Sequence, residues 1–194
     1  MPEFLVSKQE PLILASQSPR RKQLLEWAEI PFRVEVIPTN ESFPAEMEME
    51  TVPVHIARQK AMAVQEKLGT GHTVLAADTI VVLENEVIGK PTDRVEAIDT
   101  LRRLSGRTHR VITGVTIRRG EEEIAFAEIT KVSFHPLSSE QIVYYVDKLQ
   151  PYDKAGAYAI QEWIGVIGIS GIEGDFYNVV GLPVSRVARH LHIG

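Results

Sequence analysis

The stretch from Leu12 to Leu25, LILASQSPRRKQLL, constrains the fold of this chain more than any other. Its first three residues form a short apolar run, which is typical of a strand covered on both faces. Ser18 stands where a helix N-cap belongs, and Pro19 follows at the first helical position, where a missing N–H costs no hydrogen bond. The stretch therefore predicts a buried strand, a tight turn and the start of a helix.

The first turn of this predicted helix is also a candidate anion site. Its free N–H groups point at one spot, and the helix dipole favours an anion there. Ser16 and Ser18 add hydroxyl donors, while Arg20 and Arg21 add guanidinium groups that match phosphate oxygens. The alternative is a plain helix cap with two solvated arginines. Cations in a first turn oppose the helix dipole, so an anionic ligand explains them better.

The composition limits the classes of protein to which this chain can belong. The chain has 194 residues, of which 44% are hydrophobic, so it can bury a sizeable core as one domain or two small lobes. Its apolar runs are far shorter than the roughly 20 residues that span a membrane. Residues 1–10 lack the apolar segment of a signal peptide. We therefore expect a cytoplasmic protein without a membrane partner.

Charge and cysteine content narrow the possible ligands. The formal net charge is −5 and no basic stripe is visible, which argues against nucleic-acid binding. A few placed cations in an acidic chain suit a small anionic ligand instead. The chain has no cysteine, which excludes a disulfide framework, a thiolate nucleophile and a cysteine-ligated metal.

The second informative stretch is Val74–Leu83, VLAADTIVVL, which predicts a strongly apolar strand. Asp78 interrupts it. A carboxylate in such a strand is costly unless it is paired, hydrogen-bonded or bound to a metal. Asp78 is either a structural aspartate whose hydrogen bonds are made within the protein, or a catalytic or metal-binding carboxylate. We favour the catalytic or metal-binding role, because interior carboxylates are rare without a reason.

Three further charged residues are candidates for the same site. Lys60 borders the apolar stripe of a helix predicted over Pro53–Leu68, where its side chain either snorkels to solvent or reaches toward the sheet. Glu41 lies in a long acidic loop, and long loops are often functional. Lys90 follows Gly89, which permits close approach of a ligand to the backbone.

The remaining stretches predict alternating helices and strands. Apolar–polar alternation predicts a strand over Pro31–Pro38, and Asp93 with Glu96 predicts a capped helix. In order, we expect a hairpin of Val111–Arg119 and Ile124–Phe134 around Gly120, a helix from Ser138 or Ser139 to Lys148, a loop over Gln150–Gln161, a strand over Ile164–Ile169, and a terminal helix after Pro183 with Val184, Val187, Ala188 and Leu191 inward.

Together, the four cations and the acidic residues favour metal-assisted phosphoryl or nucleotidyl chemistry. The cations and the helix dipole would hold a polyphosphate. A divalent metal would bridge a carboxylate and a phosphate oxygen, and a carboxylate would activate water for attack.

Six segments, in order, make the chain similar to the Maf family of nucleoside triphosphate pyrophosphatases, first named for septum formation. They are LILASQSPRR, ARQKA, AADTIVV, IGKPTD, DKAGAYAIQ and NVVGLP, and they extend from about residue 12 to residue 184. The resemblance implies a single domain over residues 1–194 with an α/β fold. Two lobes would surround an elongated central mixed sheet with a nucleotide cleft, as in inosine-triphosphate pyrophosphatases. It also implies a homodimer.

The implied reaction is hydrolysis of a nucleoside triphosphate between its α and β phosphates, with Mg²⁺ or Mn²⁺ as cofactor. On this resemblance Asp78 is the proton acceptor, and Glu41 helps to hold the metal with it. Asp78 as general base and Asp78 as metal ligand both remain open. The positions linked to phosphate binding are Ser16, Arg21, Lys60 and Lys90.

Three positions separate the branches of the family, and here they are Arg20, Thr79 and Gln161. The combination resembles the branch that acts on dTTP and UTP, and implies a role in clearing non-standard nucleotides and a link to cell-division arrest. Two alternatives remain. One is a pyrophosphatase for 7-methyl-GTP or inosine triphosphate, and the other is a non-catalytic, nucleotide-sensing regulator of septum formation.

Overall fold

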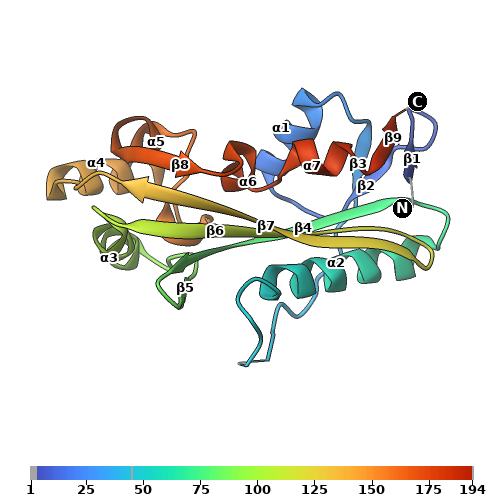
Figure 1. Ribbon diagram of the computed structural model, residues 1–194, viewed down its shortest axis with the longest axis horizontal. Coiled ribbons are helices and arrows are strands. Elements are labelled where there is room, and N and C mark those ends of the chain that lie inside the picture. The colour runs from blue at the N-terminus through green and yellow to red at the C-terminus, as the bar shows by residue number, and fades with distance from the viewer. Residues whose placement is uncertain (1–3, 45, 194) are drawn as a thin grey trace. The chain divides into compact units, whose positions relative to one another are not determined.

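The computed structural model describes residues 4–44 and 46–193, which form a mixed α/β fold (Figure 1). The helices are α1 (Pro19–Trp27), α2 (Val52–Leu68), α3 (Arg94–Leu104), α4 (Ser139–Leu149), the 3₁₀ turn η1 (Ala155–Ala157), α5 (Trp163–Gly168), α6 (Phe176–Val180) and α7 (Val184–Ala188). The strands are β1 (Phe4–Val6), β2 (Leu12–Leu14), β3 (Phe32–Val34), β4 (Val74–Leu83), β5 (Glu86–Ile88), β6 (Thr108–Arg119), β7 (Glu122–Phe134), β8 (Ile169–Glu173) and β9 (Leu191–Ile193).

The central sheet is mixed, with strand order β3-β2-β4-β6-β7-β8 and with β5 also paired to β4. Strand β2 runs parallel to both β3 and β4, whereas β5 is antiparallel to β4 and β8 is antiparallel to β7. A second, small sheet pairs β1 with β9 in parallel. The described residues include no helix that is long and apolar enough to cross a membrane.

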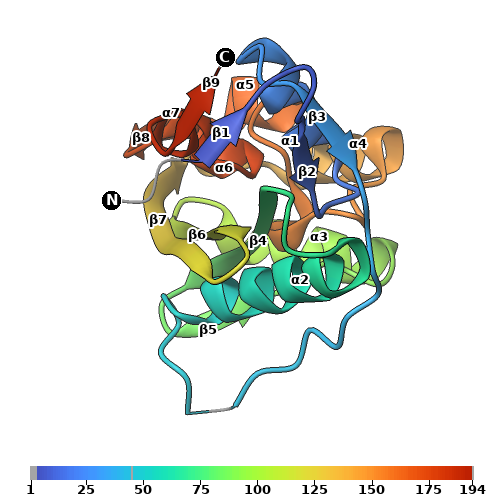
Figure 2. The same ribbon diagram turned by 90° about the vertical axis from the view of Figure 1, so that its right-hand side faces the viewer.

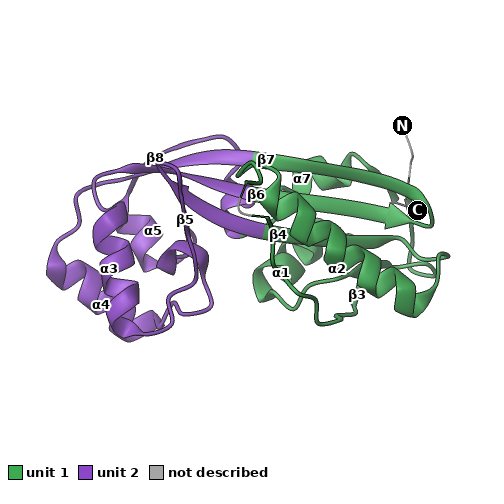
Figure 3. Cartoon of the chain, turned by 90° about the horizontal axis from the view of Figure 1, so that it is seen from below, with its two compact units in different colours: residues 1–78, 113–128, 181–194 green, residues 79–112, 129–180 purple. Residues whose placement is uncertain are grey.

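The chain divides into two compact units, coloured in Figure 3. Unit 1 comprises the chain up to residue 78, residues 113–128 and the chain from residue 181 onward. Unit 2 comprises residues 79–112 and 129–180. Strands β4, β6 and β7 therefore contribute residues to both units.

Unit 1 is built around β2, the apolar run at the start of the chain. All three residues of β2 are buried, and Ile13 and Leu14 align with Val74 and Leu75 of β4. Helix α2 covers one face of this region, while α1 and α7 lie on the other (Figures 1 and 2). The core beneath α2 consists of Ile13, Ala15, Ala57, Ala61, Val64, Val74 and Ala76, with Ile37 and Leu68 at its border. The predicted strand, turn and two helices are thus confirmed.

Unit 2 contains helices α3 and α4, and both begin with the predicted caps. The Asp93 side chain accepts a hydrogen bond from the Glu96 N–H. Ser138 and Gln141 form a reciprocal capping box, in which each side chain bonds to the backbone N–H of the other. Such caps satisfy N–H groups that have no partner inside the helix. The sequence therefore sets where these helices start.

Three sequence predictions were wrong in type or length. The strand expected over Ile164–Ile169 is instead helix α5, because the Glu162 carbonyl accepts bonds from Gly165 and Val166 and starts a helical turn. The terminal helix ends at Ala188, and Leu191 lies in β9. The third strand covers only Phe32–Val34 of the predicted range, since only these residues pair with β2.

Gly114 of β6 provides a test of the packing in unit 1. A Cβ atom at this position would lie 2.1 Å from the Pro53 carbonyl carbon and 2.1 Å from the Val54 nitrogen at the start of α2. We expect Gly114→Ala to lower the free energy of unfolding by about 3 kcal/mol or more, because backbone has to move to admit the methyl group. Urea denaturation measures the change. Gly71→Ala is the control, since a Cβ there meets nothing within 4 Å. Equal stability of the two variants would contradict the packing.

A buried histidine in unit 2 predicts a pH dependence of stability. His109 is 1% exposed, its Nε2 lies 2.8 Å from the Tyr158 hydroxyl, and its ring stacks on Phe134. Burial lowers the pKa of His109 from 6.5 to about 4. Between these two values the unfolded chain binds more protons than the folded chain, so this residue makes stability fall as the pH falls.

We expect His109→Gln to lose less stability than the wild type when the pH is lowered from 7 to 4.5. The difference should be about 2–3 kcal/mol, from the pKa values of the folded and unfolded chains. Urea denaturation at both pH values measures it. His135→Gln, at an exposed position, should lose as much as the wild type. Identical losses in all three proteins would show that His109 does not titrate in this way.

Candidate active site

Lys60 lies between two carboxylates in unit 1. Its Nζ is 2.8 Å from Asp78 Oδ1 and 2.8 Å from Glu41 Oε1. The side chains of Lys60 and Asp78 are only 17% and 15% exposed, whereas that of Glu41 is 54% exposed. Lys60 therefore does not extend into solvent from the border of α2. It neutralises the carboxylate that interrupts β4.

Each of these three residues is placed by a different element. Lys60 comes from α2, whose Ala57 and Ala61 are buried in the core. Asp78 and Thr79 are the two partly buried positions in the otherwise buried strand β4. Glu41 belongs to the segment between β3 and α2. Their meeting joins residues that the sequence separates by 18 or more positions.

Arg21 is a buried cation of unit 1, whereas Lys60 is partly buried. It is 8% exposed, its Nε donates to the Gly181 carbonyl at 2.8 Å, and its Nη1 donates to the Ser16 hydroxyl at 3.0 Å. The pKa of Arg21 is lowered from its ordinary value, and the main cause is burial. The negative charges of Asp78 and Glu41 act to raise this pKa, whereas the positive charge of Arg20 acts to lower it further. Arg21 therefore lies in the field of the same two carboxylates that flank Lys60.

Ser16 and Ser18 were both expected to donate hydroxyl hydrogens to an anion, but their contacts in the structure differ. The Ser16 oxygen accepts from both Arg21 and the Ser18 N–H, at 3.0 and 3.3 Å, so its hydroxyl hydrogen is left to donate to a ligand. Ser18 occupies the N-cap of α1, but within the described chain its side chain makes no capping hydrogen bond. The N-cap position of α1 is therefore filled by Ser18 without a capping bond from its side chain, and the helix start stays a candidate anion site.

Gly181 is a member of this cluster that the sequence did not predict as a site residue. Its carbonyl holds Arg21 from 160 positions away, and its φ of 132° belongs to a region that only glycine adopts readily. The only signal in the sequence was the glycine of the segment NVVGLP.

Glu41 and Asp78 are suited to a hard divalent cation. Their oxygens both lie 2.8 Å from one atom, so they are at most twice that distance apart. No group of three or more histidine, aspartate or glutamate residues that could enclose a metal occurs in the described part of the chain. Two carboxylates fit Mg²⁺, which is commonly bound through one or two carboxylates together with substrate phosphates.

Thr79, Lys90 and Gln161 belong to unit 2, whereas the other predicted site residues belong to unit 1. Thr79 follows Asp78 on β4, and Lys90 and Gln161 are both exposed. The Gly156 N–H donates to the Gly89 carbonyl at 3.1 Å, so the backbone next to Lys90 is tied to the segment that leads to Gln161.

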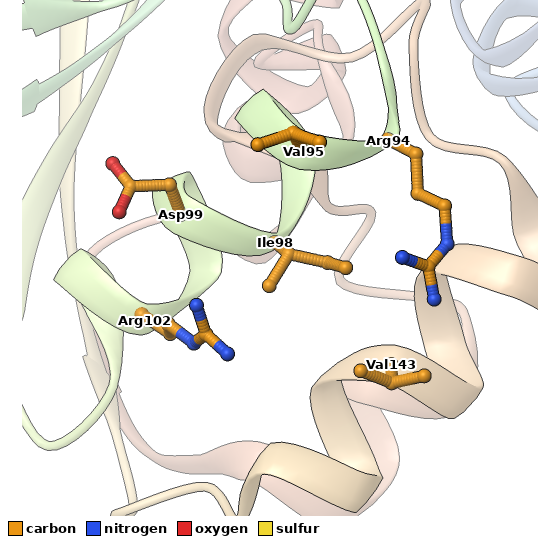
Figure 4. A pocket seen from close by; sticks show the side chains of 6 residues that line it. All are labelled: Arg94, Val95, Ile98, Asp99, Arg102 and Val143. Carbon is orange, nitrogen blue, oxygen red and sulfur yellow. The ribbon is translucent and has the colours of Figure 1, made fainter.

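A separate pocket of about 390 Å³ lies between α3 and α4 of unit 2 (Figure 4). Figure 4 shows Ile98 and Val143 facing it from the two helices, with Arg94 and Arg102 beside them. The Arg94 guanidinium is engaged by Asp147, at 2.6 and 3.1 Å. None of the predicted site residues lines this pocket, so it is distinct from the cluster around Lys60.

The fold is that of a known class of α/β protein. A HAM1 protein from Coxiella burnetii has a similar structure, with a TM-score of 0.50 over 93% of this chain and 97% of that chain, at 15% sequence identity. The sequence identifies the family more narrowly than the fold does. The family described as Maf-like protein matches residues 11–193, and the chain belongs to the Maf family.

Two relatives are similar to this chain over most of their length. A dTTP/UTP pyrophosphatase of Cytophaga hutchinsonii is 50% identical, over 93% of this chain and 82% of the relative. A dTTP/UTP pyrophosphatase of Porphyromonas gingivalis is 48% identical, over 95% of this chain and 94% of the relative.

Arg21 provides a stability test of the cluster. We expect Arg21→Lys to lower the free energy of unfolding by about 1–3 kcal/mol, because a lysine cannot donate to both Gly181 and Ser16 from one planar group. Urea denaturation measures this loss. Arg33→Lys, at an exposed position of β3, is the matched control and should change stability little. A loss no greater than that of the control would mean that the two bonds contribute nothing measurable.

Proposed function

We propose that this chain is a nucleoside triphosphate pyrophosphatase that hydrolyses dTTP and UTP between the α and β phosphates. The products are the nucleoside monophosphate and pyrophosphate, and the reaction clears excess or non-standard nucleotides. The observation that carries the proposal is the pairing of Lys60 with both Asp78 and Glu41 at 2.8 Å. The names of relatives that are 48% and 50% identical support the same substrates.

The residues of unit 1 supply charge for the phosphates and a base for water. Arg21, Lys60 and the Ser16 hydroxyl hold phosphate oxygens, and the phosphate-binding role of Lys90 stays a prediction from the sequence. Positive groups held in place before the reaction stabilise the charge that develops as the phosphoanhydride breaks. Asp78 takes the proton from water as its oxygen bonds to phosphorus, and a carboxylate that is largely shielded from solvent is suited to that role.

Glu41 and Asp78 would also hold a divalent metal, Mg²⁺ or Mn²⁺. A bound divalent cation supplies Lewis-acid polarisation of a phosphoryl oxygen. In this second assignment Asp78 is a ligand rather than the base, and Lys60 keeps the two carboxylates close to each other before the cation binds. The two roles of Asp78 are distinguished by whether its substitution weakens metal binding or only turnover.

The base of the nucleotide is selected by Arg20, Thr79 and Gln161. Gln161 is exposed and offers both a donor and an acceptor, as recognition of a pyrimidine edge requires. A site that hydrogen-bonds one base discriminates strongly against another, because the wrong base leaves polar groups unpaired. The protein would act as one functional domain over residues 1–194, as a cytoplasmic homodimer.

The decisive experiment is a nucleotide panel with product analysis. Wild type and Asp78→Asn are incubated with dTTP, UTP, CTP, GTP, 7-methyl-GTP and ITP, with Mg²⁺, Mn²⁺ or EDTA. We expect monophosphate and pyrophosphate from dTTP and UTP, no turnover in EDTA, and a loss of about 10²–10⁴-fold in Asp78→Asn, the contribution typical of a general base. Asp99→Asn, an exposed position on α3, is the control and should keep full activity.

Other outcomes would replace the proposal. Preferred turnover of 7-methyl-GTP or ITP would change the base but keep the reaction. Diphosphate and free phosphate as products would move the bond that is cleaved. Tight nucleotide binding by the wild type with no product at all would favour a nucleotide-sensing regulator of septum formation.

A further inference from the structure

The exposed Gln161 stands on a tight turn of unit 2. The Glu162 N–H donates to the Ala159 carbonyl at 3.1 Å and closes the turn, with Ile160 and Gln161 at its two central positions. Ile160 is 5% exposed, whereas the neighbouring Gln161 faces solvent. A turn closed in this way fixes the backbone angles of its central residues, and so the direction of the Gln161 side chain.

One hydroxyl group touches both ends of this turn. The Tyr145 side chain comes from α4 and is fully buried. Its hydroxyl oxygen accepts from the Ala159 N–H at 3.2 Å, and the hydroxyl donates to the Glu162 carboxylate. A phenol can accept and donate at the same time. Tyr145 therefore connects the first and last residues of the turn through a single atom.

Two further contacts hold the same turn. Lys154, which is 8% exposed, places its Nζ 3.5 Å from the Glu162 carboxylate and 2.7 Å from that of Asp153. Gly165 of α5 lies so close to Ile160 that a Cβ there would be 1.8 Å from the Ile160 carbonyl oxygen. The turn is thus fixed by a helix, an ion pair and close backbone packing, as a recognition element needs to be.

We propose that Tyr145 is a positioning residue that sets base selectivity by fixing Gln161 through the Ala159–Glu162 turn. This inference rests on the proposed function, in which Gln161 selects the base. The Tyr145 ring fills the core as a phenylalanine would, but both bonds of its hydroxyl go to the turn. The hydroxyl can therefore be removed without changing the packing of the ring. A displacement of the Gln161 side chain by about 1 Å is enough to weaken recognition of the base.

The test is the selectivity of Tyr145→Phe, measured as the ratio of kcat/KM for UTP to that for GTP. We expect the ratio to fall about tenfold, mainly through a higher KM for UTP, because a misplaced Gln161 weakens the pairing with the correct base. Tyr144→Phe is the matched control. Tyr144 is 45% exposed, and its hydroxyl accepts from Lys148 on the same helix, so its ratio should stay at the wild-type value.

A double variant shows whether Tyr145 acts through Gln161. Gln161→Ala should lower the ratio by itself, and adding Tyr145→Phe should lower it no further, because coupled residues are not additive. Glu162 provides a second route if Tyr145→Phe does not fold. Glu162→Gln keeps an acceptor for the hydroxyl and should retain selectivity, whereas Glu162→Leu should lose it.

Two results would overturn the inference while leaving the proposed function intact. One is an unchanged ratio in Tyr145→Phe, whether activity with the two nucleotides is kept or falls equally, and the other is a further fall of the ratio in the Gln161→Ala background. An unchanged ratio in Gln161→Ala would remove its role as base selector, and the inference with it. If the wild type cleaves neither nucleotide, the proposed function fails. The inference is then tested by calorimetry on the same variants, as the ratio of the Kd for GTP to the Kd for UTP.

Discussion

The ion pairs of Lys60 are the interaction on which the candidate site depends. A carboxylate in the middle of the apolar strand β4 would be costly without a partner, and a second carboxylate close to it would add repulsion. The Lys60 amino group, 2.8 Å from both, offsets the two penalties together. It also connects three separate stretches of chain, namely a loop, a helix and a strand. Removal of this one charge would disturb the placement of both carboxylates.

Local patterns in the sequence predicted the elements that carry the site. The apolar run of β2, the Ser-Pro helix start and the stripe of α2 each depend on residues within a few positions of one another, and each was confirmed. Asp78 was singled out because burying a carboxylate needs a reason, and its partner Lys60 supplies one. The structure shows the contacts of these residues, and their functional roles stay predictions.

What the sequence did not reveal depends on particular packing and pairing contacts rather than on the pattern of apolar residues. The segment after Glu162 is short, apolar and rich in glycine, and such a run is compatible with a strand or a helix. In the structure this segment is a helix, in which Gly165 packs closely against the Ile160 carbonyl. Likewise Leu191 joins β9 because that segment pairs with β1 at the other end of the described chain. No local periodicity carries information of this kind.

The bond between Arg21 and Gly181 has a consequence for the order in which the protein is made. The ribosome has to add 160 residues after Arg21 before the carbonyl that holds its guanidinium exists. At the usual 5–20 residues per second, this delay is roughly 10–30 s. During that time Arg21 lacks the carbonyl group that orients its guanidinium. The cluster around Arg21 is therefore completed late in translation, although the segment that begins it emerges early.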